Sequence, residues 1–156
     1  ASTELQTQIA GWYASGTEVV FACGGSMFQS VLSAASEYEN AKIIGVDVDQ
    51  SAESSKVITS AMKGLSASVE RILGQFYDDK WDSELADKAQ NLGAAEGATG
   101  LPEDTWSMKN FTVEQYRALF KKVADGEIVP DSKTPDDANN ADWLKGIPNV
   151  TIDFEA

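Results

Sequence analysis

Apolar residues follow two patterns along this chain, short continuous runs and repeats at helical spacing. The continuous runs lie at residues 18–23, 42–46 and 56–62. Runs of this length are typical of strands that are covered on both faces. The helical repeats lie in segments 3–16, 26–38, 69–76 and 112–126. Strands that alternate with helices in this way predict a parallel α/β sheet with right-handed crossovers.

Three of the predicted helices open with a capping-box pattern, in which glutamine follows a hydroxyl residue by three positions. The pattern occurs at residues 3–6 (TELQ), 26–29 (SMFQ) and 112–115 (TVEQ). In a capping box the hydroxyl accepts a hydrogen bond from a backbone N–H of the first turn, and the glutamine accepts one from the cap residue. We therefore expect side-chain caps at all three helix starts.

The second half of the chain is less regular than the first. Residues 90–101 (QNLGAAEGATGL) are small and glycine-rich, which predicts a strand bent around a neighbour. Residues 129–142 are polar and carry acidic clusters, but they lack the loop glycine and the terminal glutamate of a calcium-binding hand. We expect a solvated linker in this segment.

Charge and composition limit which partners the protein is expected to bind and which reactions its side chains can catalyse. The 156 residues carry 25 acidic and 12 basic side chains, for a formal net charge of −13, and contain no histidine. Such a surface repels nucleic acid and anionic lipid. Without histidine, the chain lacks the usual general base near neutral pH and the commonest metal ligand. The single cysteine, Cys23, has no such base to activate it, so we interpret it as a small buried residue at a strand end.

The length of the chain suggests one domain. No apolar run approaches the roughly 20 residues that a membrane-spanning helix requires. The chain begins at Ala1, inside a predicted helix. We therefore expect a processed or truncated chain, so the lack of a targeting signal in this sequence says nothing about where the protein is located.

Polar or glycine residues directly follow each of the three predicted strands. Gly24 and Gly25 follow the first strand, Asp47 the second and Lys63 the third. In open parallel sheets, ligands bind beyond the carboxyl ends of the strands. Each feature also has a purely structural explanation, namely a tight turn, a local cap and a solvated lysine. Their occurrence together at one predicted sheet edge favours a binding site.

The chemistry of these groups suits a small neutral molecule with hydroxyl groups. An ionised carboxylate accepts hydrogen bonds from two adjacent hydroxyls, whereas an ammonium and the exposed N–H groups of the glycine turn donate. A sugar or a nucleoside fits this set, while a phosphate would require more positive charge. The nearest rival is a dinucleotide site, but the sequence CGGSMFQ at residues 23–29 lacks the G-x-G-x-x-G series.

Several segments resemble the basic membrane protein family of ABC-transporter substrate-binding lipoproteins, which includes the purine-nucleoside receptors. The most specific pair is GVDVDQ at residues 45–50 followed by TSAMK at residues 59–63. Residues 13–35, 93–106 and 126–130 are also similar to that family. The likeness covers nearly the whole chain and corresponds to the C-terminal half of these receptors.

The resemblance implies a parallel-sheet α/β fold like that of type I periplasmic-binding proteins, of which this chain is a fragment covering part of two lobes. Residues 1–63 would form the ligand-binding segment of the second lobe, and residues 64–156 the crossover helix with a C-terminal α/β segment. The resemblance also implies a binding protein without enzymatic activity or cofactor. The intact protein would be an extracytoplasmic, membrane-anchored lipoprotein that delivers a nucleoside, with purine favoured, to an ABC permease.

Roles within the site also follow from the resemblance. Carried over by position, Asp47 would bind the ribose hydroxyls, the Gly24–Gly25 turn would line a cleft between lobes, and Lys63 would reach the ligand from a strand that crosses between them. The helix around residues 69–76 would pack on the other lobe. We expect a fragment without that lobe to cover this apolar stripe by self-association, strand exchange or pairing with its missing half.

Two other classes of protein share parts of this pattern. The effector domains of sugar-responsive sensors and repressors have the same architecture, although this acidic chain offers no basic DNA-binding headpiece. An enzyme with a nicotinamide or flavin cofactor is disfavoured by the incomplete glycine series. We therefore expect a solute-binding protein, with the sensor domain as the alternative.

Overall fold

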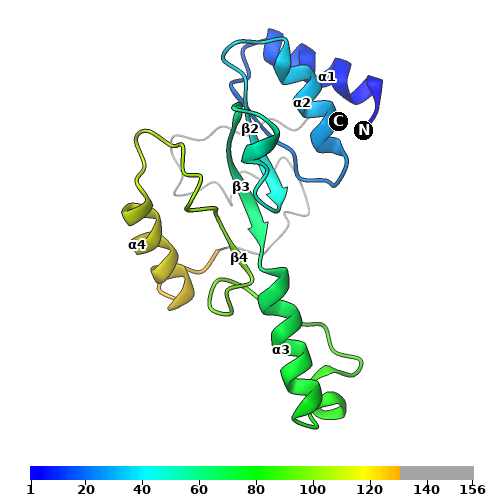
Figure 1. Cartoon of the computed structure of the whole chain (residues 1–156), viewed down its shortest axis with the longest axis vertical. Coiled ribbons are helices and arrows are strands. Elements are labelled where there is room, and N and C mark those ends of the chain that lie inside the picture. The colour runs from blue at the N-terminus through cyan, green and yellow to red at the C-terminus, as the bar shows by residue number, and fades with distance from the viewer. Residues whose placement is uncertain (131–156) are drawn as a thin grey trace, which may run out of the picture.

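A four-stranded sheet runs through the computed structural model, which describes residues 1–130 (Figure 1). Its strands are β1 (Val19–Phe21), β2 (Lys42–Asp47), β3 (Val57–Lys63) and β4 (Thr99–Gly100). They lie in the order β1-β2-β3-β4. The first three strands are parallel, as predicted, whereas β4 is antiparallel to β3. The parallel order places the carboxyl ends of β2 and β3 side by side.

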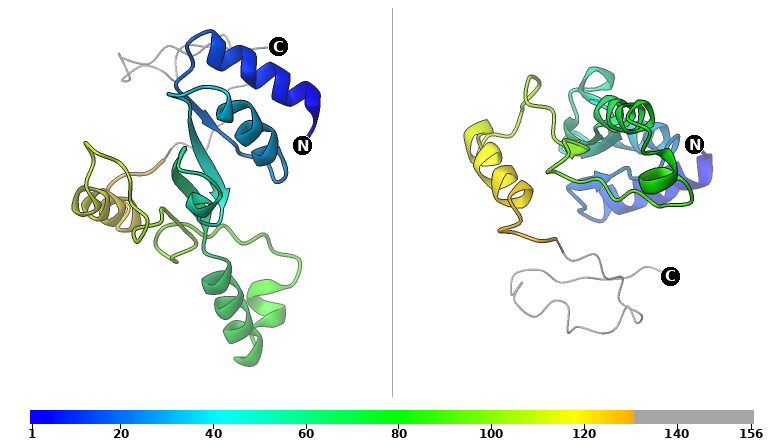
Figure 2. Two further views of the ribbon diagram at one scale, coloured as in Figure 1. Left: turned by 45° about the horizontal axis from the view of Figure 1, so that its top comes forward. Right: turned by 90° about the horizontal axis from the view of Figure 1, so that it is seen from below.

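Four α-helices accompany the sheet: α1 (Thr3–Ala14), α2 (Met27–Ser36), α3 (Leu65–Tyr77) and α4 (Val113–Ala124). Two short helical turns, η1 (Ser51–Glu53) and η2 (Trp81–Leu85), complete the described elements. Helices α1 and α2 lie together at one end of the molecule, while α3 continues from β3 and extends away from them (Figures 1 and 2). Within residues 1–130, no helix is both long enough and apolar enough to cross a bilayer.

The main hydrophobic core lies between the helix pair α1 and α2 and one face of the parallel strands. Its most deeply buried large side chains are Ile9, Phe28, Val31 and Ile43. The start of α1 is tied to α2 because the Ser30 hydroxyl accepts from the Ser2 N–H at 2.9 Å and donates to the Ser2 carbonyl at 3.0 Å. Burial of the apolar side chains of this core stabilises the fold by about 25 cal/mol per Å² of apolar surface removed from water. This core therefore anchors the amino half of the sheet.

The three predicted helix caps have three different outcomes. Thr112 and Gln115 form a complete capping box at the start of α4, as predicted. At α1 the prediction was wrong by one residue, because Ser2 is the cap and accepts from Leu5 N at 3.2 Å. At α2 the prediction was wrong, because Ser26 makes no cap hydrogen bond. Its backbone is already helical, with φ −68° and ψ −6°, whereas a capping side chain needs an extended residue.

Strand coverage also differs from the prediction. In β1 only Val20 is buried, and Val19 and Phe21 are 41% and 49% exposed. Among the described residues, therefore, a continuous apolar run does not mean that both faces of the strand are covered. The strand expected within residues 90–101 is limited to the two residues of β4. Apart from its first two positions, the linker predicted at residues 129–142 lies outside the described residues.

Candidate functional site

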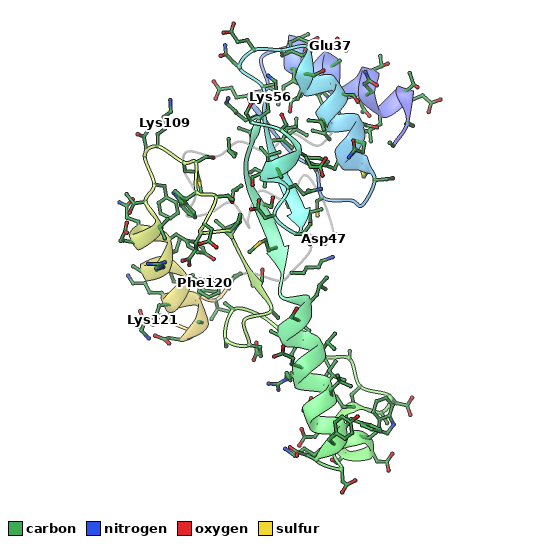
Figure 3. All side chains as sticks on the ribbon, in the orientation of Figure 1. Glu37, Asp47, Lys56, Lys109, Phe120 and Lys121 are labelled. Atoms are coloured by element: carbon green, nitrogen blue, oxygen red, sulfur yellow. The ribbon has the colours of Figure 1, made fainter. Side chains whose placement is uncertain are left out.

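Asp47 and Lys63 meet at the carboxyl ends of two adjacent parallel strands. Asp47 is the last residue of β2 and Lys63 the last residue of β3. Asp47 lies opposite Met62 in the strand register. The Lys63 ammonium contacts Asp47 Oδ1 at 2.6 Å. Figure 3 shows Asp47 at the end of the β2 arrow, just above the junction of β3 and α3. The structure thus brings together the two charged residues that the sequence pattern singled out.

This ion pair is open to solvent on one side. The Lys63 and Asp47 side chains are 63% and 41% exposed. Asp47 Oδ1 is covered, and within residues 1–130 the Lys63 ammonium is its polar partner. The hydrogen bond with Asp47, together with the attraction of its charge, raises the pKa of Lys63. Because exposed ion pairs add little to stability, this pair is not a main support of the fold.

A cleft of about 210 Å³ adjoins the ion pair. Its lining residues are Asp47, Val48, Asp49, Met62, Lys63, Gly64, Gly97, Thr99 and Gly100. They come from the ends of β2 and β3, from β4 and from the turn before β4. Charged, polar and apolar residues together line this cleft, a combination that is typical of sites for small organic molecules.

Asp49 is held by two hydrogen bonds at the edge of this cleft. Its Oδ1 accepts from Ser51 N at 2.9 Å, and its Oδ2 accepts from Thr105 Oγ1 at 2.7 Å. Partial burial acts to raise the pKa of Asp49, but these hydrogen bonds outweigh it and the pKa is lowered. Both oxygens of Asp49 are thus engaged in local structure, whereas Asp47 keeps Oδ2 without a hydrogen bond from the described residues.

The Gly24–Gly25 turn lies at the end of β1, the next strand in the sheet, and does not line this cleft among the described residues. Gly25 has φ +41°, and a Cβ at Gly24 would lie 2.4 Å from Met27 Sδ. Both glycines therefore have a structural use in the turn. A ligand contact by this turn stays a prediction.

Cys23 precedes that turn, and the prediction that it is buried was wrong. The side chain is exposed. The physical reason is that burial alternates along this extended segment, so that Val20 and Ala22 are buried in the core whereas Phe21 and Cys23 are exposed. Cys23 is close enough to Lys63 to contribute to the raised pKa of that residue. The cysteine thus lies on the same rim as the ion pair.

Sequence reasoning missed three residues that shape the turn carrying Asp47, namely Gly45, Gln50 and Ser60. Gln50 Oε1 accepts from Val46 N at 2.9 Å, and Gln50 N donates to Ser60 Oγ at 3.1 Å. A Cβ at Gly45 would lie 2.5 Å from Gln50 Oε1 and 2.7 Å from Ser60 Oγ. One signal was present: Ser60 is a polar residue inside an apolar strand, and buried polar groups require a partner.

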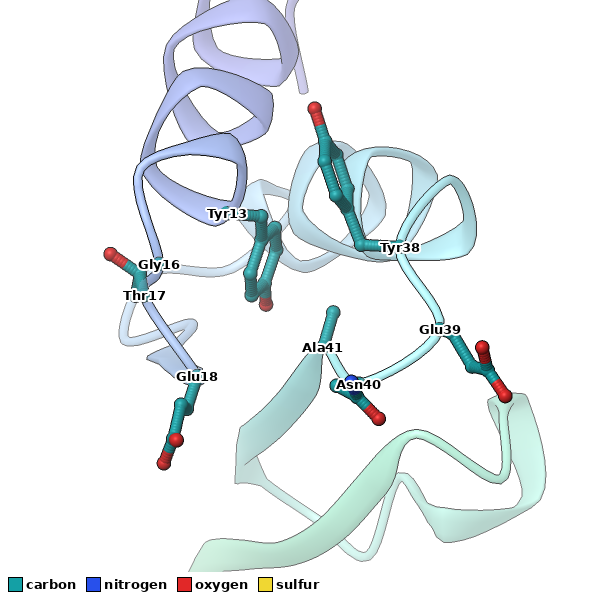
Figure 4. A pocket seen from close by; sticks show the side chains of 8 residues that line it. All are labelled: Tyr13, Gly16, Thr17, Glu18, Tyr38, Glu39, Asn40 and Ala41. Atoms are coloured by element: carbon teal, nitrogen blue, oxygen red, sulfur yellow. The ribbon is translucent and has the colours of Figure 1, made fainter.

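A second pocket, of about 330 Å³, lies at the opposite ends of β1 and β2 (Figure 4). Tyr13 is at its centre and donates from its hydroxyl to the Lys42 carbonyl at 2.9 Å. Burial raises the pKa of Tyr13 to about 12. Figure 4 shows the carboxylates of Glu18 and Glu39 pointing away from one another. The two carboxylates of this pocket do not meet, whereas Asp47 and Lys63 are in contact, so we take the Asp47–Lys63 cleft as the candidate site.

In open α/β proteins, ligands bind beyond the carboxyl ends of the parallel strands, which is where Asp47 and Lys63 meet. The chain matches the family model of Bmp, described as ABC transporter substrate-binding protein PnrA-like, over residues 6–133. The chain therefore belongs to this family of PnrA-like ABC transporter substrate-binding proteins. The match includes all four predicted site residues.

Among solved structures, the chain is similar to an ABC transporter system solute-binding protein from Aeropyrum pernix K1, with a TM-score of 0.60 and 20% identity. The alignment covers 92% of this chain and 48% of that one, so the chain spans about half the length of this relative. The likeness confirms the predicted α/β fold of the periplasmic-binding-protein type. A search of curated proteins found no match to the chain.

Proposed function

We propose that this chain contributes the Asp47–Lys63 wall of a nucleoside site in the extracytoplasmic solute-binding component of an ABC importer. The observation that carries the proposal is the ion pair itself, with its 2.6 Å contact between two partly exposed side chains that both line a cleft. Residues 1–63 would be the ligand-binding segment of one lobe, and residues 64–156 would cross to the other lobe and return.

The chemistry of the ion pair supports a ligand with adjacent hydroxyls. Lys63 holds Oδ1 of Asp47, and Asp47 lines the cleft, which leaves Oδ2 as a second acceptor without a hydrogen bond from the described residues. A carboxylate oxygen can accept from two neighbouring hydroxyls, as in the 2′,3′-diol of a ribose. Hydrogen bonds to charged groups contribute about 1.5–3 kcal/mol each. A ribose held in this way leaves its base to contact the remainder of the cleft.

Charge supports an uncharged ligand over a phosphorylated one. Two carboxylates, Asp47 and Asp49, and one ammonium, Lys63, line the cleft. A phosphate would bring further negative charge to a chain of net charge −13. Like charges in a partly desolvated site repel strongly. We therefore expect nucleosides to bind and nucleotides to be rejected.

Calorimetric titration of the complete solute-binding protein that contains this chain tests the proposal. The ligands are inosine, guanosine, ribose, inosine monophosphate and NAD. We expect heat of binding with the two nucleosides, weaker binding of ribose and none with the phosphorylated compounds. Binding of NAD alone would indicate a dinucleotide site. Binding of ribose with no preference for nucleosides would support the sugar-sensor alternative.

We also propose that the other lobe of the same solute-binding protein covers α3. None of the residues of α3 is buried within the described part of the chain. Its exposed apolar stripe consists of Leu65, Val69, Leu73 and Phe76, which are 49–56% exposed. Each such side chain left in water forfeits about 1.5–3 kcal/mol. A relative about twice as long as this chain supplies enough additional chain for a second lobe.

In the isolated 156-residue chain, the α3 stripe is expected to drive self-association. Leu73→Gln should shift the chain toward monomer in sedimentation velocity, because it removes apolar surface from the middle of the stripe. Glu70→Gln, at an exposed position of α3 outside the stripe, serves as the matched control and should leave the distribution unchanged. A wild-type chain that stays monomeric at every concentration would contradict this expectation.

A further inference from the structure

The backbone at Asp47 adopts an uncommon conformation. Its φ is +71°, a region that few residues other than glycine occupy. The N–H of Val48 donates to the carbonyl of Val46 at 2.9 Å, across Asp47. An i→i+2 hydrogen bond around a residue with positive φ is the rarer, strained form of γ-turn. Strained conformations persist only where the surrounding structure holds them.

Gln50 supplies the contacts that hold this turn. Its side-chain Oε1 accepts from Val46 N at 2.9 Å, which closes the turn from the inside. Its backbone N–H donates to Ser60 Oγ at 3.1 Å, which attaches the turn to β3. Ser60 is fully buried, so this attachment is made to a rigid part of the sheet. The turn thus cannot rotate without breaking hydrogen bonds at two places.

Gly45 makes room for this arrangement. It lies opposite Ser60 in the strand register. A Cβ there would lie 2.5 Å from Gln50 Oε1 and 2.7 Å from Ser60 Oγ, closer than real Cβ contacts. Gly45, Gln50 and Ser60 therefore form one packed unit, which we call the turn clamp. Asp47 is the residue that this clamp leaves projecting toward Lys63.

We infer that Gln50 is a positioning residue of the binding site: through the turn clamp it holds Asp47 so that Oδ1 meets Lys63 and Oδ2 stays available to a diol-bearing ligand. The inference rests on the proposed function for the identity of the ligand, but its geometric part does not. Loss of the Gln50 acceptor would leave Val46 N–H unpaired and release the γ-turn. Asp47 would then relax toward the ordinary strand conformation and away from the ammonium.

The test compares three variants of the complete protein. Gln50→Met keeps the length of the side chain but removes the acceptor, and Gln50→Glu restores an acceptor oxygen. Ser107→Ala breaks a hydrogen bond from Ser107 Oγ to the Ile58 carbonyl at 2.9 Å, near the start of β3, and touches neither the clamp nor the cleft, so it is the matched control. We expect inosine binding to weaken by about tenfold or more in Gln50→Met, to recover in Gln50→Glu and to be unchanged in Ser107→Ala.

A second measurement needs no ligand. The rate at which an amine-selective reagent acylates Lys63, followed by mass spectrometry, reports whether Asp47 still pairs with the ammonium. We expect faster acylation in Gln50→Met and a wild-type rate in Ser107→Ala. Thermal unfolding of each variant separates positioning from stability.

The possible outcomes distinguish this inference from the proposed function. If the wild-type protein binds no nucleoside but Lys63 is still acylated faster in Gln50→Met than in the wild type, the proposed function fails and the positioning role stands. If Gln50→Met changes neither affinity nor acylation, the positioning role is overturned. The same conclusion follows if Gln50→Met and Ser107→Ala weaken binding in equal proportion to their loss of thermal stability.

Discussion

Asp47→Ala is expected to weaken nucleoside binding by about a hundredfold or more, the largest effect on affinity that we predict for a single residue. The variant removes the carboxylate that accepts from the ligand hydroxyls and also leaves the Lys63 ammonium without its partner. Two hydrogen bonds to a charged acceptor contribute about 3–6 kcal/mol together, which sets the expected size. Calorimetric titration of the complete protein with inosine measures the loss.

Two further variants make this experiment specific to the Asp47 carboxylate. Asp47→Asn keeps a residue that tolerates positive φ but removes the charge, so we expect an intermediate loss of affinity. Glu53→Ala removes an exposed carboxylate from the neighbouring turn η1 and should bind like the wild type. Unchanged affinity in Asp47→Ala would show that the ligand is held elsewhere and would refute the proposed site.

Gly64→Ala is expected to give the largest loss of stability, about 1–3 kcal/mol or more in the free energy of unfolding. A Cβ at Gly64 would lie 2.0 Å from the Gly97 carbonyl oxygen and 2.9 Å from Ala98 Cα. These are backbone atoms, which cannot move aside as the end of a flexible side chain can. The hydrogen bond from Gly64 N to Ala98 O at 2.9 Å would be lost as the turn shifts.

Gly74→Ala provides a matched control of opposite sign. Gly74 lies in α3, and a Cβ there would meet nothing within 4 Å. Replacement of glycine by alanine within a helix stabilises by about 0.5–1 kcal/mol. Urea unfolding of both variants measures the difference. Equal stability of Gly64→Ala and Gly74→Ala would mean that the turn before β4 does not pack on Gly64.

Only part of the candidate site could be predicted from the sequence. Asp47 and Lys63 were recognisable because each directly follows an apolar run, and the ends of neighbouring parallel strands share one edge of a sheet. The Gly24–Gly25 turn was recognisable by the same rule, yet it does not line the cleft among the described residues. A strand end shows the edge on which a residue lies, but not the distance from that residue to a ligand.

The caps and Cys23 show why local pattern is insufficient at element ends. Ser26 and Thr112 stand in the same sequence motif, but only Thr112 has the extended backbone that a cap requires. The difference arises from the preceding chain, where Gly25 takes a positive φ and leads Ser26 into the helix early. Cys23 was expected to be buried because the apolar run continues through it, whereas burial alternates along residues 19–23 and leaves Cys23 exposed.

Helical repeats and continuous runs of apolar residues were enough to locate the helices and the parallel strands, because each of these patterns arises within a single segment. Contacts between distant segments established everything else about the site: the reach of Gln50 to Ser60, the space that Gly45 leaves, and the turn that lies against Gly64. Such contacts depend on how close two backbones approach after folding. No pattern within a single segment carries that distance.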